Sequence, residues 1–345
     1  MQARPLAHAY FPLGPRYCRQ TRRLSQRILQ GLAATWLTIV PVIVDAQSYP
    51  ARPVRIVVAF SAGGTTDILA RSIGQQLSER LKQPFVIENK PGAGGNIGTE
   101  LVVRSAPDGY TLIVDSVGPI AVNPTLYKGL SYNPITDLIP IVQIADVPNV
   151  LVVHPSLGVK NFQELIAYAK ANPGKLNYSS TGIGTSSHLS GFMLSKRAGI
   201  DAIHVPYKGA DALNDLLSGR VQFMFATIPS VIQHIQAGRL IPIAVSSARR
   251  SRSLPEVPTV IENGLPGFEA SSWFGFFAPK GTPEPVITQL NRTVNEILAV
   301  PAIENQMIRE GADPVGGTPA GFGQFVLREH EKWMLVVRES GATPE

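Results

Sequence analysis

The chain has 345 residues, of which 44% are hydrophobic, 31 are basic and 25 are acidic. This length and apolar content suffice for a core spread over two domains. The positive charge is concentrated in residues 1–46, which carry six basic residues and one acidic residue. The remaining chain carries 25 basic and 24 acidic residues, which excludes the strongly basic surface typical of nucleic-acid binding.

The first 46 residues are predicted to be a secretory signal peptide. Arginines precede an apolar stretch of 14 residues, Gly31 to Val44, which is too short for a membrane span. Small residues at Val44 and Ala46 indicate cleavage near Ala46, so we expect a periplasmic mature protein. The pair Arg22-Arg23 resembles part of a twin-arginine signal, and the sequence leaves open which export route is used.

The chemistry open to the mature chain is limited. The single cysteine, Cys18, lies in the leader, so disulfides, thiol nucleophiles and thiolate metal ligands are excluded. No G-x-S-x-G motif is present, which gives a hydrolase triad little support. The later histidines show no metal-ligand spacing; they are His154, His188, His204, His234 and His330. We therefore expect no metal site.

A β-branched run followed by a loop of small residues opens the mature chain. Leu69, Ile73 and Leu77 then recur every four residues, which predicts an amphipathic helix after the loop. Because the loop has no long side chains, a ligand can approach backbone N–H groups at the helix start, where the dipole favours an anion. The predicted ligand-binding residues are Phe60, Ser61, Ala62, Gly63, Gly64, Thr65 and Asp67.

A second loop of this kind follows the predicted strand 176–180. Its predicted ligand-binding residues are Ser180, Thr181, Gly182, Gly184 and Thr185. The alternative is that both loops are ordinary turns, in which the glycines serve turn geometry and Asp67 is only a helix cap. Two such loops in one chain nevertheless favour a small acid held between two lobes.

Strand and helix signals alternate along the chain, which predicts α/β layers with largely parallel sheets. Strands are expected at 84–88, 109–114, 203–205, 221–225 and 240–246. Helices are expected from the end of the Gly-rich segment 89–98 to Ser105, after the Asn161 cap, and at 211–219, 230–237, 285–300, 302–310 and 320–340. Two segments, 141–154 with an interruption at Pro148 and 270–279, are expected to cross between lobes. The predicted first lobe is 49–148 plus 272–345, and the second is 149–271.

Four further residues at strand ends are candidate ligand contacts. Asp115 and Ser116 follow the strand 109–114, and Pro206 and Tyr207 follow the strand 203–205. The sequence leaves open whether Tyr207 contacts the ligand or fills the interface between the lobes.

The glycines between 92 and 98 permit a second interpretation. Their spacing is G-x-G-x-x-x-G, one residue longer than the dinucleotide-binding fingerprint, although Asp115 lies near the position of its acidic residue. The alternative is a glycine-rich turn that packs beside the first loop.

Several segments in a fixed order resemble one known family, the extracytoplasmic solute receptors of tripartite tricarboxylate transporters, also called the Bug family. The matching segments are 49–50, 60–67, 89–98, 108–112, 172–178, 204–209 and 254–259, and the resemblance covers essentially all of 49–345.

The resemblance implies a type II-like two-lobed periplasmic-binding-protein fold, a Venus flytrap, that closes on its ligand without catalysis or cofactor. Such receptors bind small carboxylates, largely through backbone N–H groups of the two loops and bridging water. They pass the ligand to membrane transporter subunits, and we expect a monomer. One departure is Ala226, a candidate ligand-binding position where family members often carry an acidic residue, so the resemblance leaves the identity of the ligand open.

Two other functions were weighed against transport. A ligand sensor that presents its closed form to a signalling partner would share the same fold and site. An enzyme that uses a nucleotide cofactor conflicts with the glycine spacing and with the export signal.

Overall fold

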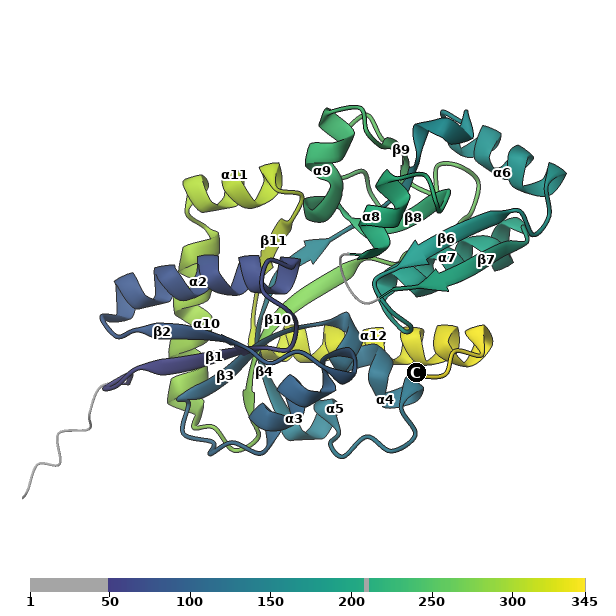
Figure 1. Ribbon diagram of the computed structural model, residues 1–345. Coiled ribbons are helices and arrows are strands. Elements are labelled where there is room, and N and C mark those ends of the chain that lie inside the picture. Colours follow the sequence, from purple (N-terminus) through teal and green to yellow (C-terminus); the bar gives the residue numbers. More distant parts are fainter. Residues whose placement is uncertain (1–48, 208–210, 345) are drawn as a thin grey trace, which may run out of the picture. The chain divides into compact units, whose positions relative to one another are not determined.

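The computed structural model describes residues 49–207 and 211–344, and within them the chain forms two β-sheets flanked by helices (Figure 1). The predicted signal peptide lies outside the described residues. None of the helices that the structure describes is both long and apolar enough to cross a membrane.

The first sheet contains six strands in the order β11-β4-β10-β3-β1-β2. Their bounds are β1 (Val54–Val58), β2 (Phe85–Asn89), β3 (Thr111–Ser116), β4 (Leu138–Val147), β10 (Ser272–Pro279) and β11 (Asp313–Gly316). Helices α2 (Thr65–Leu81) and α10 (Glu284–Leu298) cover one face, where Ile73 and Leu290 pack with Ile56. Helices α3 (Asn96–Val103) and α12 (Pro319–Ser340) cover the other, and α11 (Pro301–Arg309) precedes β11.

The second sheet contains five strands in the order β7-β6-β8-β5-β9. Their bounds are β5 (Asn149–Val153), β6 (Leu176–Ser180), β7 (Ala202–Pro206), β8 (Phe223–Thr227) and β9 (Ile241–Val245). Helices α8 (Asp211–Leu217) and α9 (Ile228–Gln236) pack on one face, and α6 (Phe162–Ala171) and α7 (Ser186–Ala198) on the other. The predicted cap of α6 is confirmed, because the Asn161 side chain accepts the Glu164 N–H at 2.9 Å.

The prediction of largely parallel sheets is wrong. Strand β1 is parallel to β2 and β3, and β6 is parallel to β7 and β8. Strands β4, β5, β10 and β11 pair antiparallel with all their neighbours. Strands β4 and β5 are separated only by Pro148, so the chain passes from one sheet to the other in extended form. Strand β10 brings the chain back from the second sheet to the first, so it runs opposite to β4 and pairs with it antiparallel.

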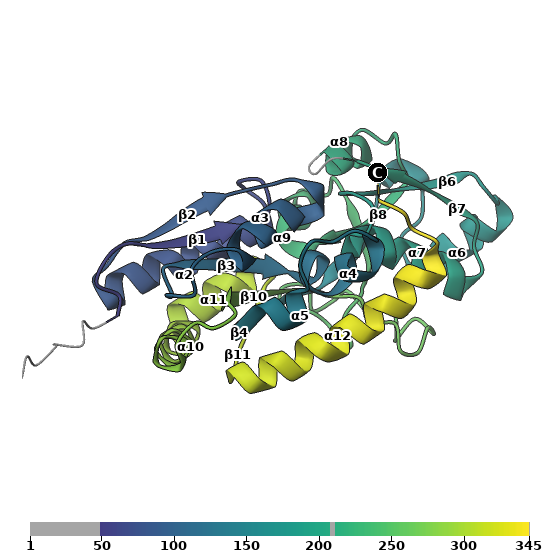
Figure 2. The ribbon, with the colours of Figure 1, turned by 90° about the horizontal axis from the view of Figure 1, so that it is seen from below.

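Several short helices lie between the strands, and the sequence analysis did not predict them because one or two turns give no periodic signal. They are η1 (Ala93–Gly95), η2 (Gly118–Val122), α4 (Asn123–Leu126), α5 (Pro134–Asp137) and η3 (Pro155–Leu157). Leu126 of α4 and Trp333 of α12 belong to the same buried cluster as Leu189 of α7 and Phe225 of β8. Figure 2 shows α12 passing beside α4 toward α7. The two sheets therefore share one continuous apolar core on this side.

Candidate functional site

The first loop, residues 60–64, connects β1 to α2 and lies largely at the surface. Ser61, Ala62, Gly63 and Gly64 are exposed, and a Cβ placed on Gly63 would meet no atom within 4 Å. Helix α2 begins after Gly64 with no hydrogen bond from a capping side chain. The first N–H groups of an α-helix have no partner within the helix, so this helix end can donate to an anion.

Asp67 supports the first loop from within α2. Its Oδ2 accepts the Gly63 N–H at 2.9 Å and Nε of Arg71 at 3.0 Å. Its Oδ1 accepts from Asn89 Nδ2 at 2.9 Å, and the same nitrogen donates to the Phe60 carbonyl at 3.0 Å. Burial opposes ionisation, but the bonds from Arg71, Gly63 and Asn89 outweigh it and lower the pKa of Asp67. Asp67 is therefore an ionised side chain that holds the first loop in place, and we call it the brace of this loop.

The second loop, residues 181–185, connects β6 to α7 and is more enclosed. Thr185 caps α7, because its Oγ1 accepts the His188 N–H at 3.4 Å. Gly184 has φ +79° and is buried, and a Cβ there would clash with Leu126 of α4. Ser180 has no exposed surface, and its Oγ lies 2.7 Å from His204 Nε2. Thr181 is exposed, so the surface that this loop offers lies near Thr181 and Gly182.

A contact between the starts of α2 and α9 adds a third helix start to the candidate site, which the sequence analysis did not predict. Thr65 Oγ1, at the start of α2, lies 3.5 Å from Thr227 Oγ1. Thr227 is the N-cap residue of α9 and its side chain makes no capping bond. The prediction ended the strand at Phe225 and began the helix at Ser230, so this position was assigned to a linker. A strand that ends directly in Thr-x-Pro was the available signal.

Asp115 and Ser116 lie at the end of β3, where the sequence placed them, but both are buried. Asp115 has no exposed surface, and burial raises its pKa to about 7 despite bonds with Thr99 and Ser116. Thr99 Oγ1 lies 2.6 Å from Asp115 Oδ2 and 3.0 Å from the Gly95 carbonyl. The single hydroxyl proton of Thr99 can serve only one acceptor, so a protonated Asp115 that donates to Thr99 satisfies both contacts. This burial does not favour a direct contact with the ligand.

Two other residues predicted at the site have contacts within the protein. Ala226 is 1% exposed and pairs with Val150 across β8 and β5. The Tyr207 hydroxyl donates to Asp215 Oδ2 at 2.7 Å, and burial followed by this bond raises the pKa of Tyr207 to about 12. Pro206 is exposed at the end of β7, and Lys208 and Gly209 lie outside the described residues.

The glycine-rich turn 92–98 packs beside the first loop, as the alternative to the dinucleotide-binding fingerprint predicted. A Cβ on Gly95 would clash with Pro119 and lie 3.2 Å from Phe60, and one on Gly98 would lie 2.8 Å from the Ala59 Cα. These glycines thus serve close packing against β1 and its loop.

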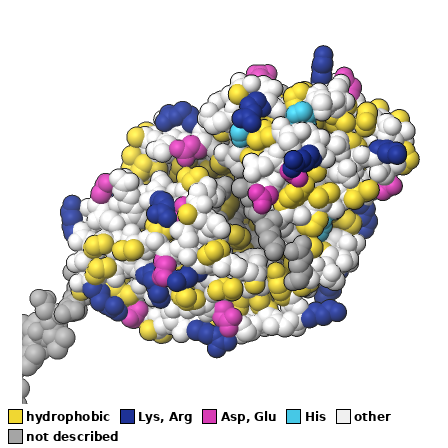
Figure 3. Space-filling view, in the orientation of Figure 1, with side chains coloured by type: hydrophobic (Ala, Val, Ile, Leu, Met, Phe, Trp, Pro, Cys, Tyr) yellow, Lys and Arg dark blue, Asp and Glu magenta, His cyan; other side chains and the backbone are white. Residues whose placement is uncertain are grey.

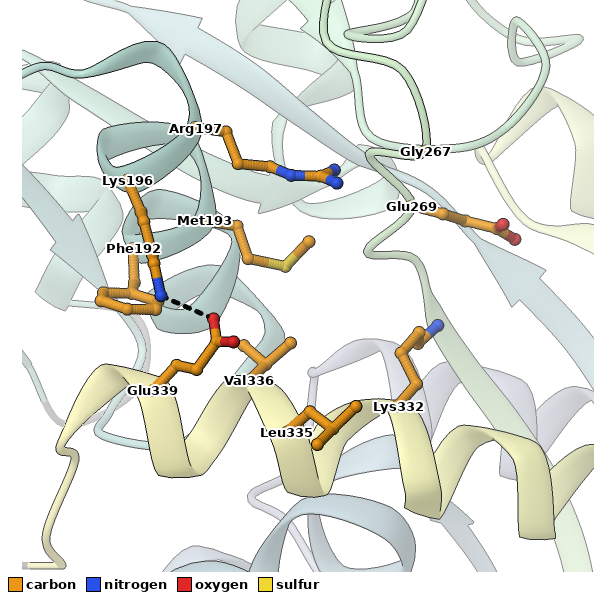
Figure 4. A pocket seen from close by; sticks show the side chains of 10 residues that line it. All are labelled: Phe192, Met193, Lys196, Arg197, Gly267, Glu269, Lys332, Leu335, Val336 and Glu339. Atoms are coloured by element: carbon orange, nitrogen blue, oxygen red, sulfur yellow. Dashed lines mark hydrogen bonds and ion pairs between the residues drawn. The ribbon is translucent and has the colours of Figure 1, made fainter.

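A cavity of about 310 Å³ lies between α7 and α12, and none of the predicted ligand contacts lines it (Figure 4). Phe192, Met193 and Val336 form its apolar wall, and Lys196 pairs with Glu339 across it at 2.8 Å. Within residues 49–207 and 211–344, no cluster of histidine and carboxylate side chains could hold a metal ion. On the face seen in Figure 3, basic and acidic side chains are interspersed without a basic stripe.

Two sheets are joined by extended crossing strands, and each sheet has one strand that leads through a small-residue loop into a helix. This arrangement defines the class of two-lobed solute-binding proteins. The sequence profile of the tripartite tricarboxylate transporter family receptor matches residues 69–342. The chain therefore belongs to this receptor family.

Individual relatives agree with this assignment. The chain is 41% identical to the protein BugT of Bordetella pertussis over 301 residues, which cover 87% of this chain and 92% of BugT. A solved R. palustris protein with adipate is 40% identical with a TM-score of 0.82, covering 86% of this chain and all of that one. MatC from Rhodopseudomonas palustris, solved with bound malate, is 33% identical with a TM-score of 0.76, covering 84% of this chain and all of MatC.

Proposed function

We propose that this chain is a periplasmic receptor that binds a small dicarboxylate and delivers it to a tripartite tricarboxylate-type membrane transporter. The observation that carries the proposal is the uncapped start of α2 beside the open space at Gly63. A helix start with free N–H groups behaves like about half a positive charge, which attracts a carboxylate without a buried cation. The adipate and malate in the two related structures are both dicarboxylates.

The ligand is proposed to lack an ammonium group. Asp67 already accepts bonds from Gly63, Arg71 and Asn89, and Asp115 is fully buried. Position 226 carries a buried alanine that offers no acceptor side chain. A ligand ammonium would thus lose water without gaining a carboxylate partner, which is unfavourable.

The ligand is proposed to lie between two lobes, 49–148 plus 272–345 and 149–271. The contact between Thr65 and Thr227 supports this location, because it joins the helix ends of the two halves. Closure is proposed to be a hinge rotation about the crossing segments near Pro148 and Ser271. Ligand favours the closed form because only that form contacts it from both sides.

Further parts of the proposal concern the site of action. The chain is proposed to be exported by its leader, cleaved near Ala46, and to act as a non-catalytic monomer. Mass spectrometry of the periplasmic protein is expected to place the N-terminus within a few residues of Gln47. Soluble protein that retains residues 1–46 would contradict the proposed export.

A thermal-shift screen of the periplasmic protein tests the ligand class. The panel pairs each acid with its amino analogue: succinate with aspartate and glutarate with glutamate, beside adipate, malate, citrate and benzoate. A ligand at 100 times its Kd stabilises the protein by about 2.7 kcal/mol, or roughly 5 °C in Tm for a protein of this size. Stabilisation by an amino acid but not by its deaminated partner would overturn the proposed ligand class.

A further inference from the structure

Two histidine rings are stacked against each other next to the second loop. His188 lies in the first turn of α7 and His204 on β7, with ring centroids 3.9 Å apart and planes inclined by 17°. Tyr178 of β6 stacks on His204 at 4.9 Å, and Phe223 of β8 stacks on Tyr178 at 5.3 Å. The imidazoles thus end a column of aromatic rings that leads from the core to the loop.

Both imidazoles bond to the loop itself. The Gly184 N–H donates to His188 Nδ1 at 3.1 Å, which requires that nitrogen to be unprotonated. His204 Nε2 lies 2.7 Å from Ser180 Oγ, and the same oxygen accepts the Gly182 N–H at 3.3 Å. The two rings therefore hold the loop at its beginning and near its end.

The surroundings of the pair favour its neutral form. Burial lowers the pKa of His188 to about 4. Burial and the neighbouring His188 lower that of His204 to about 3. In the described structure, the titratable groups that face the pair are Tyr178 from β6 and the two imidazoles themselves. A proton on His188 Nδ1 would point at the Gly184 N–H and replace an attraction by a repulsion.

We propose that His188 and His204 are positioning residues that hold the Ser180–Thr185 loop in its binding shape only while both rings are uncharged. The affinity of the receptor for an anionic ligand then falls at acidic pH. The effect on ligand binding rests on the proposed function. The conformation of the loop itself can be measured in the ligand-free protein.

A local measurement is needed because other buried groups mask the effect on global stability. The histidines, with pKa values lowered from about 6.5, make the folded state less stable as pH falls from about 6.5 to 4. Burial raises the pKa of Asp115 to about 7, and burial and neighbouring acids do the same for Asp146. These carboxyls make the folded state more stable as pH falls through the same range, so the two contributions oppose each other.

Hydrogen exchange at the Gly184 amide of the ligand-free protein tests the proposal directly. Protonation of His188 alone is expected to lower the protection factor roughly fiftyfold between pH 7 and 4.5. This figure follows from a His188 pKa of about 6.5 in the locally opened loop and about 4 in the intact loop. The double variant His188→Asn/His204→Gln keeps neutral hydrogen-bonding side chains at both positions and is expected to show a level profile. The single variant His188→Asn, which leaves His204 in place, is a second test. Its protection factor at Gly184 is expected to fall less in acid than that of the wild type.

His154→Asn is the matched control, because His154 Nδ1 also accepts a backbone N–H, from Ser156 at 3.3 Å, but does so at η3. This variant is expected to keep the wild-type profile at Gly184. A wild-type protection factor that does not fall in acid would overturn the proposal, and so would an equal fall in the double variant.

Titration with adipate and malate at pH 7.5 and 4.5 gives the functional outcome. The ratio of the wild-type and double-variant dissociation constants removes the titration of the ligand itself. This ratio is expected to rise at least severalfold in acid, and a constant or falling ratio would overturn the coupling to ligand. If neither acid binds at pH 7.5, the proposed choice of ligand fails while the exchange experiment still decides the role of the histidines.

Discussion

The two loops follow the same sequence plan but are held in opposite ways. The first is exposed, lies at an uncapped helix start and is braced by Asp67, whose pKa is lowered. The second lies at a helix start capped by Thr185, is closed off by Leu126 and is held by neutral imidazoles. A strand, a small-residue loop and a helix thus specify where a ligand can approach. They do not specify how accessible the backbone is.

The largest effect is expected from valine at the two glycines with positive φ. Gly63 and Gly184 have φ of +82° and +79°, so Gly63→Val and Gly184→Val share a strain of about 1–3 kcal/mol. Only Gly184→Val also overpacks Leu126, which adds about 1–3 kcal/mol. In urea denaturation, the free energy of unfolding of Gly184→Val is expected to lie well below that of Gly63→Val. The Gly63→Val protein is expected to fold but to lose ligand binding. Equal losses of stability would remove the distinction between the loops.

Asp115→Asn tests the neutral carboxyl behind the first loop. An amide keeps the contacts to Thr99 and Ser116 but cannot ionise. Because burial raises the pKa of Asp115 to about 7, the wild type loses stability as pH rises from about 3.9 to 7, and the variant lacks this loss. Between pH 5 and 7 the unfolding free energy of the variant is expected to gain about 2 kcal/mol on the wild type. A constant difference would show that Asp115 is ionised.

Asp67→Asn weakens the brace of the first loop. The loss of the charge-assisted bonds to Gly63 and Arg71 is expected to cost about 1–2 kcal/mol at pH 7. Because the pKa of Asp67 is lowered, its contribution is complete above about pH 3.9 and is lost as pH falls below that value. Chemical denaturation at pH 7 and 3 is expected to show the variant and wild type converging in acid. Parallel curves would contradict an ionised brace.

The smallest effect is expected from Ser180→Ala. The variant removes one hydroxyl that bonds to His204 and Gly182, which corresponds to about 1 kcal/mol in ligand affinity or stability. Calorimetric titration with the best acid of the panel measures it, beside circular dichroism for folding. Complete loss of binding in a folded Ser180→Ala protein would show that this side chain, and not the backbone, grips the ligand.

Local sequence determined most of the secondary structure. The spacing of Leu69, Ile73 and Leu77 predicted the buried face of α2, and Asn161 marked the start of α6. Pro148 marked the point where the chain leaves one sheet for the other. These features depend on residues within a few positions of one another, so their pattern can be recognised without knowledge of distant contacts.

The tertiary structure decided the state of each candidate side chain. Asp115 was predicted at the ligand, and the structure buries it completely beside Thr99, where burial raises its pKa to about 7. Ser180 and His188 looked like loop and helix residues, and only the pairing of β6 with β7 brings His204 next to them. Accessibility, protonation and the meeting of Thr65 with Thr227 depend on segments far apart in the chain, and no local pattern encodes these distances.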